Sequence, residues 1–168
     1  MTEAKPIVGV VMGSDSDLEI MKRCLKQLEH FGIAHEVRVI SAHRTPEDAH
    51  QYAATAADRG LRVIIAAAGM SAALAGVMAA NTTLPVIGVP VDSGPLQGLD
   101  AMLSTLQMPP GIPVGAMAIG KAGATNAAIY ATQILALGDA ELAAKLREFK
   151  QQQAEKVRKK DADVQRDV

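Results

Sequence analysis

Short apolar runs alternate along the chain with segments of helical periodicity. Each run is a few residues long and rich in valine, isoleucine or alanine, which is typical of strands buried on both faces of a parallel sheet. The runs predict strands at 7–12, 35–40, 63–67, 86–89 and 114–119. The helices between and after them are predicted to end near Gly32, Gly60, Ala80, Leu106 and Leu137. This alternation indicates an α/β domain built on a parallel sheet.

The last segment of the chain, 139–168, has a different pattern. From Ala140 to about Lys160 it is charged and helical, and Leu142, Leu146 and Phe149 form a thin apolar stripe. Such a segment is either a solvated helix that frays or an arm that docks on a neighbouring subunit. We therefore expect a single domain over 1–168, with an α/β core at 6–138 and a C-terminal helical arm at 139–168.

The composition limits the kind of protein that this chain can be. With 168 residues and a mass of 17.6 kDa, the chain is long enough for one domain with a real core. Hydrophobic residues make up 49 % of the chain but aromatic residues only 2 %, which favours close approach of helices and strands. The formal net charge of −1 provides no field that would attract nucleic acid or an anionic membrane.

The single cysteine, Cys24, excludes an internal disulfide and a cysteine-based metal cluster. It lies beside the apolar stripe of the first predicted helix, so we expect a small buried side chain. No apolar run precedes Pro6, and no stretch approaches the ~20 apolar residues of a membrane span. We expect a soluble, cytoplasmic protein without a signal peptide.

A polar turn at 41–46, with the sequence SAHRTP, joins the second predicted strand to the second predicted helix. His43 can both give and take a proton near neutral pH. The planar guanidinium of Arg44 suits phosphate. The turn therefore predicts an acid/base group beside an anion-binding group. The alternative is a histidine that caps the helix and an arginine on the surface, because turns between strands and helices are commonly polar.

The same turn marks the start of the second helix. We expect Thr45 to be the N-cap and Pro46 to occupy the first helical turn. Asp48 is expected to complete an interaction like that of a capping box.

A second polar turn, GSDSD at 13–17, follows the first predicted strand. Gly13 and Ser14 stand at a predicted helix N-terminus, where free backbone N–H groups and the helix dipole suit a phosphate. The turn is not a P-loop, because the Gly-Lys-Ser/Thr ending is absent. It also lacks the glycine spacing of a dinucleotide fingerprint, which disfavours NAD.

Turns that follow parallel strands lie at the carboxyl edge of the sheet, where ligands bind. They are candidate walls of one site, or of a site shared between subunits, at 13–17, 41–45, 68–71, 90–98 and 120–124. In the turn at 68–71, Gly69 is a candidate substrate-binding residue.

The three other histidines have no comparable setting. His30 lies at a helix end, His35 at a strand start and His50 inside a helix. No pair has the spacing of a zinc-binding helix, and the acidic residues are spread over helix faces. We therefore expect no metal.

Taken together, several segments resemble the PurE family, the 5-(carboxyamino)imidazole ribonucleotide mutases of purine biosynthesis. The similarity covers about Val8 to Leu137, in the family's own order. It is carried by the segments MGSDSD at 12–17, SAHRTP at 41–46, LPVIGVP at 84–90, QMPPGIPV at 107–114 and AIGKAGATNAA at 118–128.

The resemblance implies a three-layer α/β/α sandwich of the flavodoxin or Rossmann type, with about five parallel strands. It implies a homo-octamer, in which sites lie between subunits and C-terminal helices embrace neighbours. The implied reaction moves a carboxylate from the exocyclic nitrogen of a ribonucleotide to ring carbon C4. The reaction passes through CO2 and uses no ATP, metal or other cofactor.

The resemblance also implies roles for individual residues. Ser14 and Arg44 would hold the 5′-phosphate, Asp17 the ribose hydroxyls, and Ser41, Gly13 and Gly69 would line the substrate site. His43 would protonate the departing nitrogen and later remove the proton from C4. Exclusion of water would keep the CO2 in the pocket.

One stretch, 70–76, departs from the family pattern. Many members read Gly-Ala-Ala-His-Leu-Pro-Gly there, whereas this chain has Ala73 and Ala75 at the histidine and proline places. A related branch, the aminoimidazole ribonucleotide carboxylases that use CO2 directly, also lacks that histidine but typically has lysine at the place of Arg44. Arg44 and the segment 119–124 favour the mutase. The direct carboxylase and, more remotely, a nucleotide-binding module without chemistry remain as alternatives.

Overall fold

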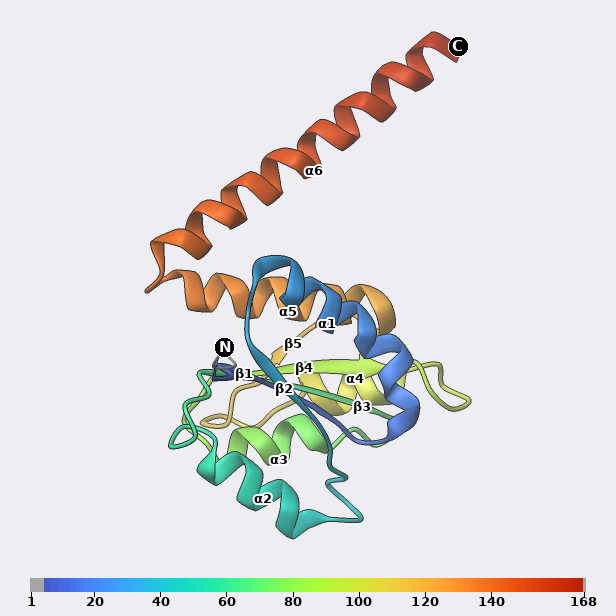
Figure 1. Cartoon of the computed structure of the whole chain (residues 1–168). Helices are drawn as coiled ribbons and strands as arrows, with labels where there is room; N and C mark the ends of the chain where they lie inside the picture. The colour runs from blue at the N-terminus through green and yellow to red at the C-terminus, as the bar shows by residue number, and fades with distance from the viewer. Residues whose placement is uncertain (1–4, 168) are drawn as a thin grey trace. The chain divides into compact units, whose positions relative to one another are not determined.

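A parallel sheet of five strands forms the centre of the computed structural model, which describes residues 5–167 (Figure 1). The strands are β1 (Val8–Met12), β2 (His35–Val39), β3 (Val63–Gly69), β4 (Val86–Val91) and β5 (Gly115–Ala116). Their order in the sheet is β2-β1-β3-β4-β5, which is that of flavodoxin-like doubly wound sheets. The predicted α/β fold with a parallel sheet is confirmed.

Helices cover both faces of this sheet, as expected for a three-layer sandwich. The helices of the chain are α1 (Leu18–Phe31), α2 (Pro46–Thr55), α3 (Leu74–Ala80), α4 (Leu99–Leu106), α5 (Gly120–Ala136) and, after the sheet region, α6 (Ala140–Asp167); a short 3₁₀ turn, η1 (Asp15–Asp17), precedes α1. Figure 1 shows α1 and α5 on one side of the sheet and α2 and α3 on the other. The predicted glycine stop of α1 is confirmed, because Gly32 follows the helix with a left-handed φ of 73°.

Small side chains allow the helices to approach the sheet closely, as the composition predicted. Gly88 in β4 faces α4, and a Cβ at this position would overlap the methyl group of Thr105. Cys24 is fully buried, and burial raises the pKa of its thiol to about 12. The prediction of a packing cysteine is therefore confirmed, since a reactive thiol needs a lowered pKa.

The last two strands differ from the prediction. β4 continues through Pro90, which lies opposite Ala68 of β3, instead of ending before it. β5 has two residues instead of the six expected at 114–119, and it pairs with β4 only at Ile87 and Gly88. The pairing between β5 and β4 ends before Pro90. The missing N–H of proline therefore breaks no hydrogen bond to a strand on that side.

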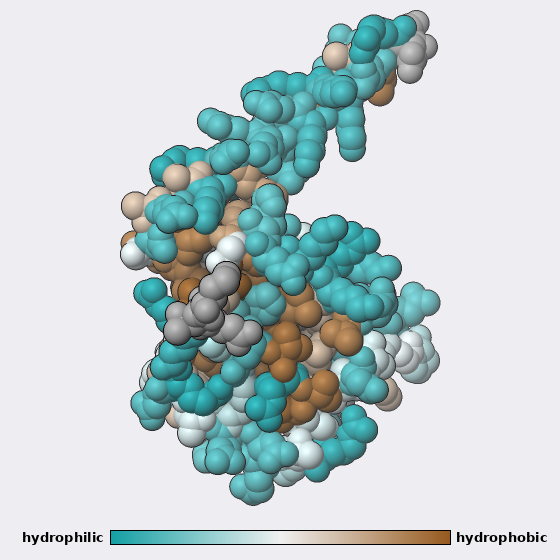
Figure 2. All heavy atoms as spheres, in the orientation of Figure 1, coloured by the Kyte–Doolittle hydropathy of each residue, from teal (hydrophilic) through white to brown (hydrophobic). Residues whose placement is uncertain are grey.

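The described chain divides into two compact units, with the boundary inside α5 between Ala131 and Thr132. In the second unit, α6 continues beyond the predicted end near Lys160. Leu142 and Leu146 are buried, whereas Val157 and Val164 are 66 % and 61 % exposed. Figure 2 shows mostly hydrophilic side chains along the second half of this helix.

Within residues 5–167, no helix combines the length and the apolar character that a membrane crossing requires. The expectation about the segment before Pro6 concerns mainly residues 1–4, which lie outside the described residues.

Candidate functional site

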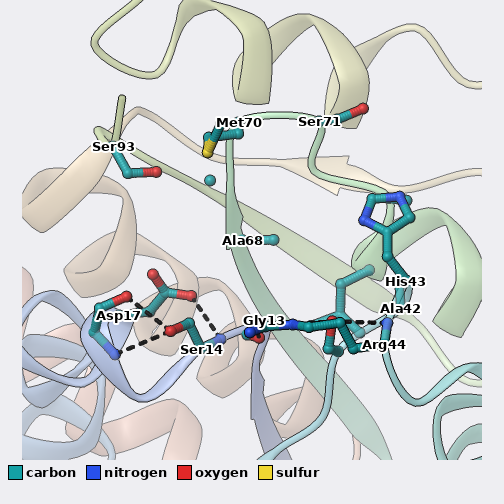
Figure 3. Close-up of a pocket in the computed structure, with 15 residues that line it drawn as sticks. Gly13, Ser14, Asp17, Ala42, His43, Arg44, Ala68, Met70, Ser71 and Ser93 are labelled. Atoms are coloured by element: carbon teal, nitrogen blue, oxygen red, sulfur yellow. Dashed lines mark hydrogen bonds between the residues drawn. The ribbon is translucent and has the colours of Figure 1, made fainter. Parts of the chain in front are cut away.

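A cavity of about 520 Å³ lies at the carboxyl ends of the first three strands (Figure 3). All seven residues that the sequence nominated line it: Gly13, Ser14, Asp17, Ser41, His43, Arg44 and Gly69. The other lining residues are Ser16, Ala42, Ala68, Met70, Ser71, Ala73, Leu74 and Ser93. The turn at 120–124, the fifth candidate wall, does not contribute. It follows β5, which lies at the far edge of the sheet from β2.

The first wall is the turn between β1 and α1. The Ser14 N–H donates to Asp17 Oδ2 at 3.2 Å, and the Ser16 N–H donates to the Ser14 hydroxyl at 3.3 Å. The Asp17 N–H donates to the Ser14 carbonyl. The prediction of free amides is therefore wrong for these three groups, because the turn uses them to start its own helix. This wall therefore lines the cavity with the side chains of Ser14, Ser16 and Asp17.

Asp17 is the buried acid of the site. Its side chain lines the cavity, yet the residue is only 4 % exposed. Burial raises the pKa of this carboxyl, and the hydrogen bond from the Ser14 N–H opposes the rise. A carboxyl held in this way is suited to accept hydrogen bonds from hydroxyl groups of a ligand.

The second wall is the turn between β2 and α2, in which Arg44 forms hydrogen bonds with uncharged oxygen atoms. The Arg44 N–H and Nε–H both donate to the Ser41 hydroxyl, at 3.2 and 3.3 Å. Arg44 Nη2 donates across the pocket edge to the Gly13 carbonyl at 3.3 Å. Among the residues that the structure describes, no carboxylate forms an ion pair with Arg44. The guanidinium is thus oriented while its charge is left for an anion.

Thr45 is the N-cap residue of α2, as predicted, but its side chain makes no capping hydrogen bond. Its hydroxyl donates to the Ser41 carbonyl and accepts from the Ser41 N–H, both at 3.1 Å. Pro46 stands in the first turn of α2, as predicted. The Thr45 hydroxyl is used in these hydrogen bonds to Ser41, which compete with a capping bond to the helix and close the turn. The closed turn carries His43 at its tip.

His43 is an exposed side chain that lines the cavity. Figure 3 shows its ring on the side of the pocket formed by Ser71, away from Ser14 and Asp17. The ring is not packed away in an apolar setting, so it can exchange protons with a bound molecule. Among the described lining residues it is the one imidazole.

The third wall comes from the end of β3 and from the turn after β4. A Cβ on Gly69 would overlap the Ser93 hydroxyl, so the two segments touch only because residue 69 is glycine. Ala73 stands at the N-cap position of α3 and gives that helix no side-chain cap. Ala73 therefore contributes no titratable group to this wall.

Sequence reasoning did not single out Ser93 or Met70. Ser93 falls in the turn at 90–98, which was a candidate wall, but nothing in its local sequence distinguishes it. Met70 is a large apolar residue in a turn of small ones, and this contrast was the available signal. No group of three or more His, Cys, Asp or Glu able to hold a metal ion occurs in the described part of the chain.

The chain belongs to the AIR carboxylase family, whose model matches residues 7–156. It is 51 % identical over 160 residues to the N5-carboxyaminoimidazole ribonucleotide mutase of Pyrococcus horikoshii, an alignment that covers 95 % of this chain and 89 % of that protein. It is 54 % identical over 144 residues to the enzyme of the same name from Bacillus subtilis, with 86 % and 89 % covered. The crystal structure of Treponema denticola PurE superimposes with a TM-score of 0.83 at 31 % identity, covering 94 % of this chain and 97 % of that one.

Proposed function

We propose that this protein is an isomerase of purine biosynthesis that converts 5-(carboxyamino)imidazole ribonucleotide to 4-carboxy-5-aminoimidazole ribonucleotide. The observation that carries the proposal is a pocket in which three groups face the same space: an exposed imidazole, a buried carboxyl, and an arginine with no carboxylate partner among the described residues. Family membership and the names of the Pyrococcus and Bacillus relatives support the same reaction.

The proposed mechanism uses His43 twice. As an acid, it gives a proton to the exocyclic nitrogen while the bond between that nitrogen and the carboxyl carbon breaks, which frees CO2. The ring carbon C4 then attacks the CO2, and His43 removes the proton from C4. One proton is given and one is recovered, so the net change is an isomerisation.

The remaining lining residues hold the substrate in this proposal. Arg44 and Ser14 bind the 5′-phosphate, Asp17 binds the ribose hydroxyls, and Ser41 orients Arg44. Support comes from the hydrogen bonds that fix the guanidinium between Ser41 and Gly13. Gly69 keeps the third wall close, since a side chain there would displace Ser93.

A two-substrate assay tests this function. Purified protein is given either the carboxyamino nucleotide or aminoimidazole ribonucleotide with bicarbonate, at matched concentrations. We expect faster product formation from the first. Preference for bicarbonate would instead support the direct carboxylase, for which the alanine at position 73 is the one favouring observation. Turnover of neither substrate would leave nucleotide binding without chemistry.

We also propose that the protein self-associates, as an octamer according to the resemblance. Leu96, Leu99, Leu103 and Leu106 are 46–57 % exposed. Three of them share one face of α4, and a second copy presents the same apolar face. Sedimentation of the double variant Leu99→Asp, Leu103→Asp should show smaller species. Leu137→Asp, at a residue that is 91 % exposed, is the matched control and should sediment like the native protein.

The C-terminal arm at 139–168 is proposed to pack on a neighbouring subunit. Val157 and Val164 are exposed and lie seven residues apart, so they share a helix face. Replacing both with aspartate should weaken association in the same sedimentation experiment. Unchanged sedimentation would favour a solvated helix. The proposed pathway places the enzyme in the cytoplasm.

A further inference from the structure

Met70 has an unusual backbone conformation for its residue type. Its φ is 55°, and Gln97 at 50° is the other non-glycine residue with a positive φ in the described chain. Residues with a Cβ adopt this left-handed region at a cost in energy, so glycine ordinarily takes such positions. A large side chain held there calls for a functional explanation.

The Met70 side chain lies close to the turn after β4. A Cβ added to Gly94 would lie 3.4 Å from Met70 Cγ and 3.9 Å from Sδ, so the side chain runs close over that glycine. One residue earlier on each segment, Ser93 lies against Gly69. Two successive contacts therefore align the end of β3 with this turn at the edge of the pocket.

Met70 combines exposure with a place in the pocket lining. The residue is 57 % exposed and lines the cavity. Figure 3 shows it between Ser93 and Ser71, across the pocket from Ser14 and Gly13. Its immediate neighbours in the lining, Gly69 and Ser71, carry little apolar surface. Methionine is unbranched and flexible, so the thioether can fold over a bound ring.

The proposed reaction creates a need for such a group. Between cleavage of the N–C bond and formation of the bond at C4, CO2 is not covalently held. Water that enters at this stage lets CO2 escape or hydrates it to bicarbonate. The wall formed by Ala68, Ser71 and Ala73 contains only small side chains, so it cannot cover the ring by itself.

We propose that Met70 is a positioning residue that covers the substrate ring and retains CO2 in the pocket during the isomerisation. The inference rests on the proposed function. In this view the left-handed backbone at position 70 serves to place the methionine side chain at the pocket. Met70 exchanges no proton and forms no bond with the substrate.

The test follows the fate of the carboxyl carbon. Substrate labelled with ¹³C in its carboxylate is converted in unlabelled bicarbonate buffer, and mass spectrometry measures how much label the product retains. A blank without enzyme corrects for spontaneous loss of CO2. We compare the native protein with Met70→Gly, which relaxes the backbone and removes the side chain, and Met70→Leu, which keeps apolar bulk. Gln97→Gly relaxes the same kind of backbone strain outside the pocket and is the matched control.

We expect the ratio of lost to retained label to rise about tenfold in Met70→Gly. Met70→Leu and Gln97→Gly should resemble the native protein, and sedimentation should be the same for all four. Unchanged retention in Met70→Gly overturns the inference, and so does an equal loss in Gln97→Gly. A change of sedimentation in Met70→Gly alone identifies a subunit contact instead and also overturns it. Failure of the native protein to isomerise the substrate overturns the proposed function together with this inference.

Discussion

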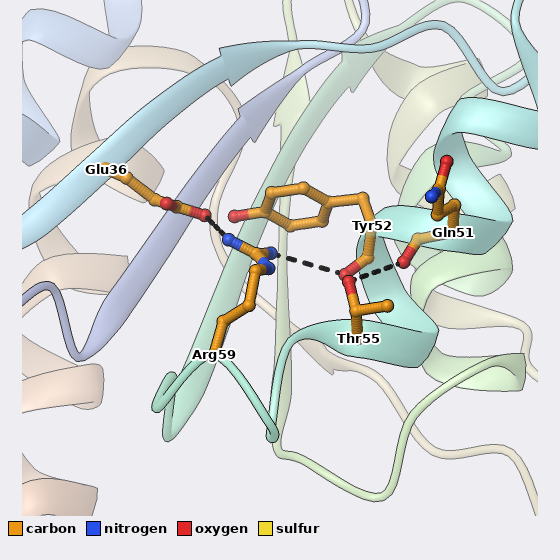
Figure 4. Close-up of polar contacts among 5 residues, drawn as sticks. All are labelled: Glu36, Gln51, Tyr52, Thr55 and Arg59. Carbon is orange, nitrogen blue, oxygen red and sulfur yellow. Dashed lines mark hydrogen bonds and ion pairs between the residues drawn. The ribbon is translucent and has the colours of Figure 1, made fainter.

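Two arginines of this protein show opposite uses of the same side chain. Arg59 lies beside α2 and pairs with Glu36 of β2, with Nη1 2.5 Å from Oε1 (Figure 4). Its guanidinium lies over the Tyr52 ring at 4.6 Å and donates to the Tyr52 carbonyl. Arg44 is instead held by a hydroxyl and a carbonyl group, both uncharged. The charge of Arg59 is paired within the fold, whereas Arg44 has no carboxylate partner among the described residues.

The titration behaviour of the Arg59 cluster agrees with this difference. Burial acts to raise the pKa of Glu36, but the hydrogen bond from Arg59 and its charge outweigh burial and lower it. Burial raises the pKa of Tyr52, and the Glu36 carboxylate adds to the rise. These groups stay in one charge state near neutral pH, which is what a structural cluster requires.

The largest effect on activity is expected from a substitution in the pocket. His43→Asn removes the proposed acid and base, so kcat should fall by about 10²–10⁴-fold. The melting temperature should change little, because the ring is exposed. Steady-state kinetics and thermal melts measure both. His50→Asn, outside the pocket, is the control for loss of an imidazole, and native turnover in His43→Asn would refute the mechanism.

Arg44→Gln tests the proposed role of this arginine in binding the substrate phosphate. Loss of a charge-assisted contact to phosphate should raise KM by roughly 10–100-fold, in line with about 1.5–3 kcal/mol for such hydrogen bonds. Thermal stability should be nearly native. The same change at Arg38, which is exposed and lies outside the cavity, is the control. A large loss of stability in Arg44→Gln with native KM would assign it to the fold.

Arg59→Ala should show the reverse pattern. It removes the ion pair with Glu36 and the contact with Tyr52, so the free energy of unfolding should fall by roughly 1–3 kcal/mol. Denaturant titration measures this loss, and Arg38→Ala provides the exposed control. Because the cluster lies outside the cavity, kcat and KM of the folded variant should stay native. A lowered kcat at full folding would contradict the division between the two arginines.

The smallest effect concerns pH. The pKa of Glu36 is lower in the folded protein than in the unfolded chain, so the pair stabilises the fold above the usual carboxyl range. This contribution should be lost as pH falls from about 5 through the folded pKa, and it should be below about 1 kcal/mol. The difference in stability between the native protein and Glu36→Gln should therefore shrink in acid. A difference independent of pH would exclude the ion pair as its cause.

Much of the fold was predictable from local pattern, and the exceptions have a common reason. Strands β1 and β3 are continuous apolar runs because both faces of the sheet are covered there, whereas the edge strand β2 mixes polar residues with valine and is partly exposed. The positions of all three were predicted within two residues. The path of β4 through Pro90 and the shortness of β5 were not predicted. The lengths of β4 and β5 depend on where these two strands pair. The residues of one strand do not show how far the neighbouring strand extends.

The site divides in the same way. The sequence by itself determined the chemical groups, an imidazole and a guanidinium in one turn and hydroxyls in another, because residue type decides what a group can donate or accept. It also determined that these turns meet, since parallel strands deliver their carboxyl ends to one edge. Only the tertiary structure decided which turns share the pocket, because β1 lies between β2 and β3 while β5 is distant. It also decided that Ser93 and Met70 reach the cavity, because the end of β3 meets the turn after β4 there. These two segments are far apart in the chain, and their separation along the chain says nothing about their distance in space.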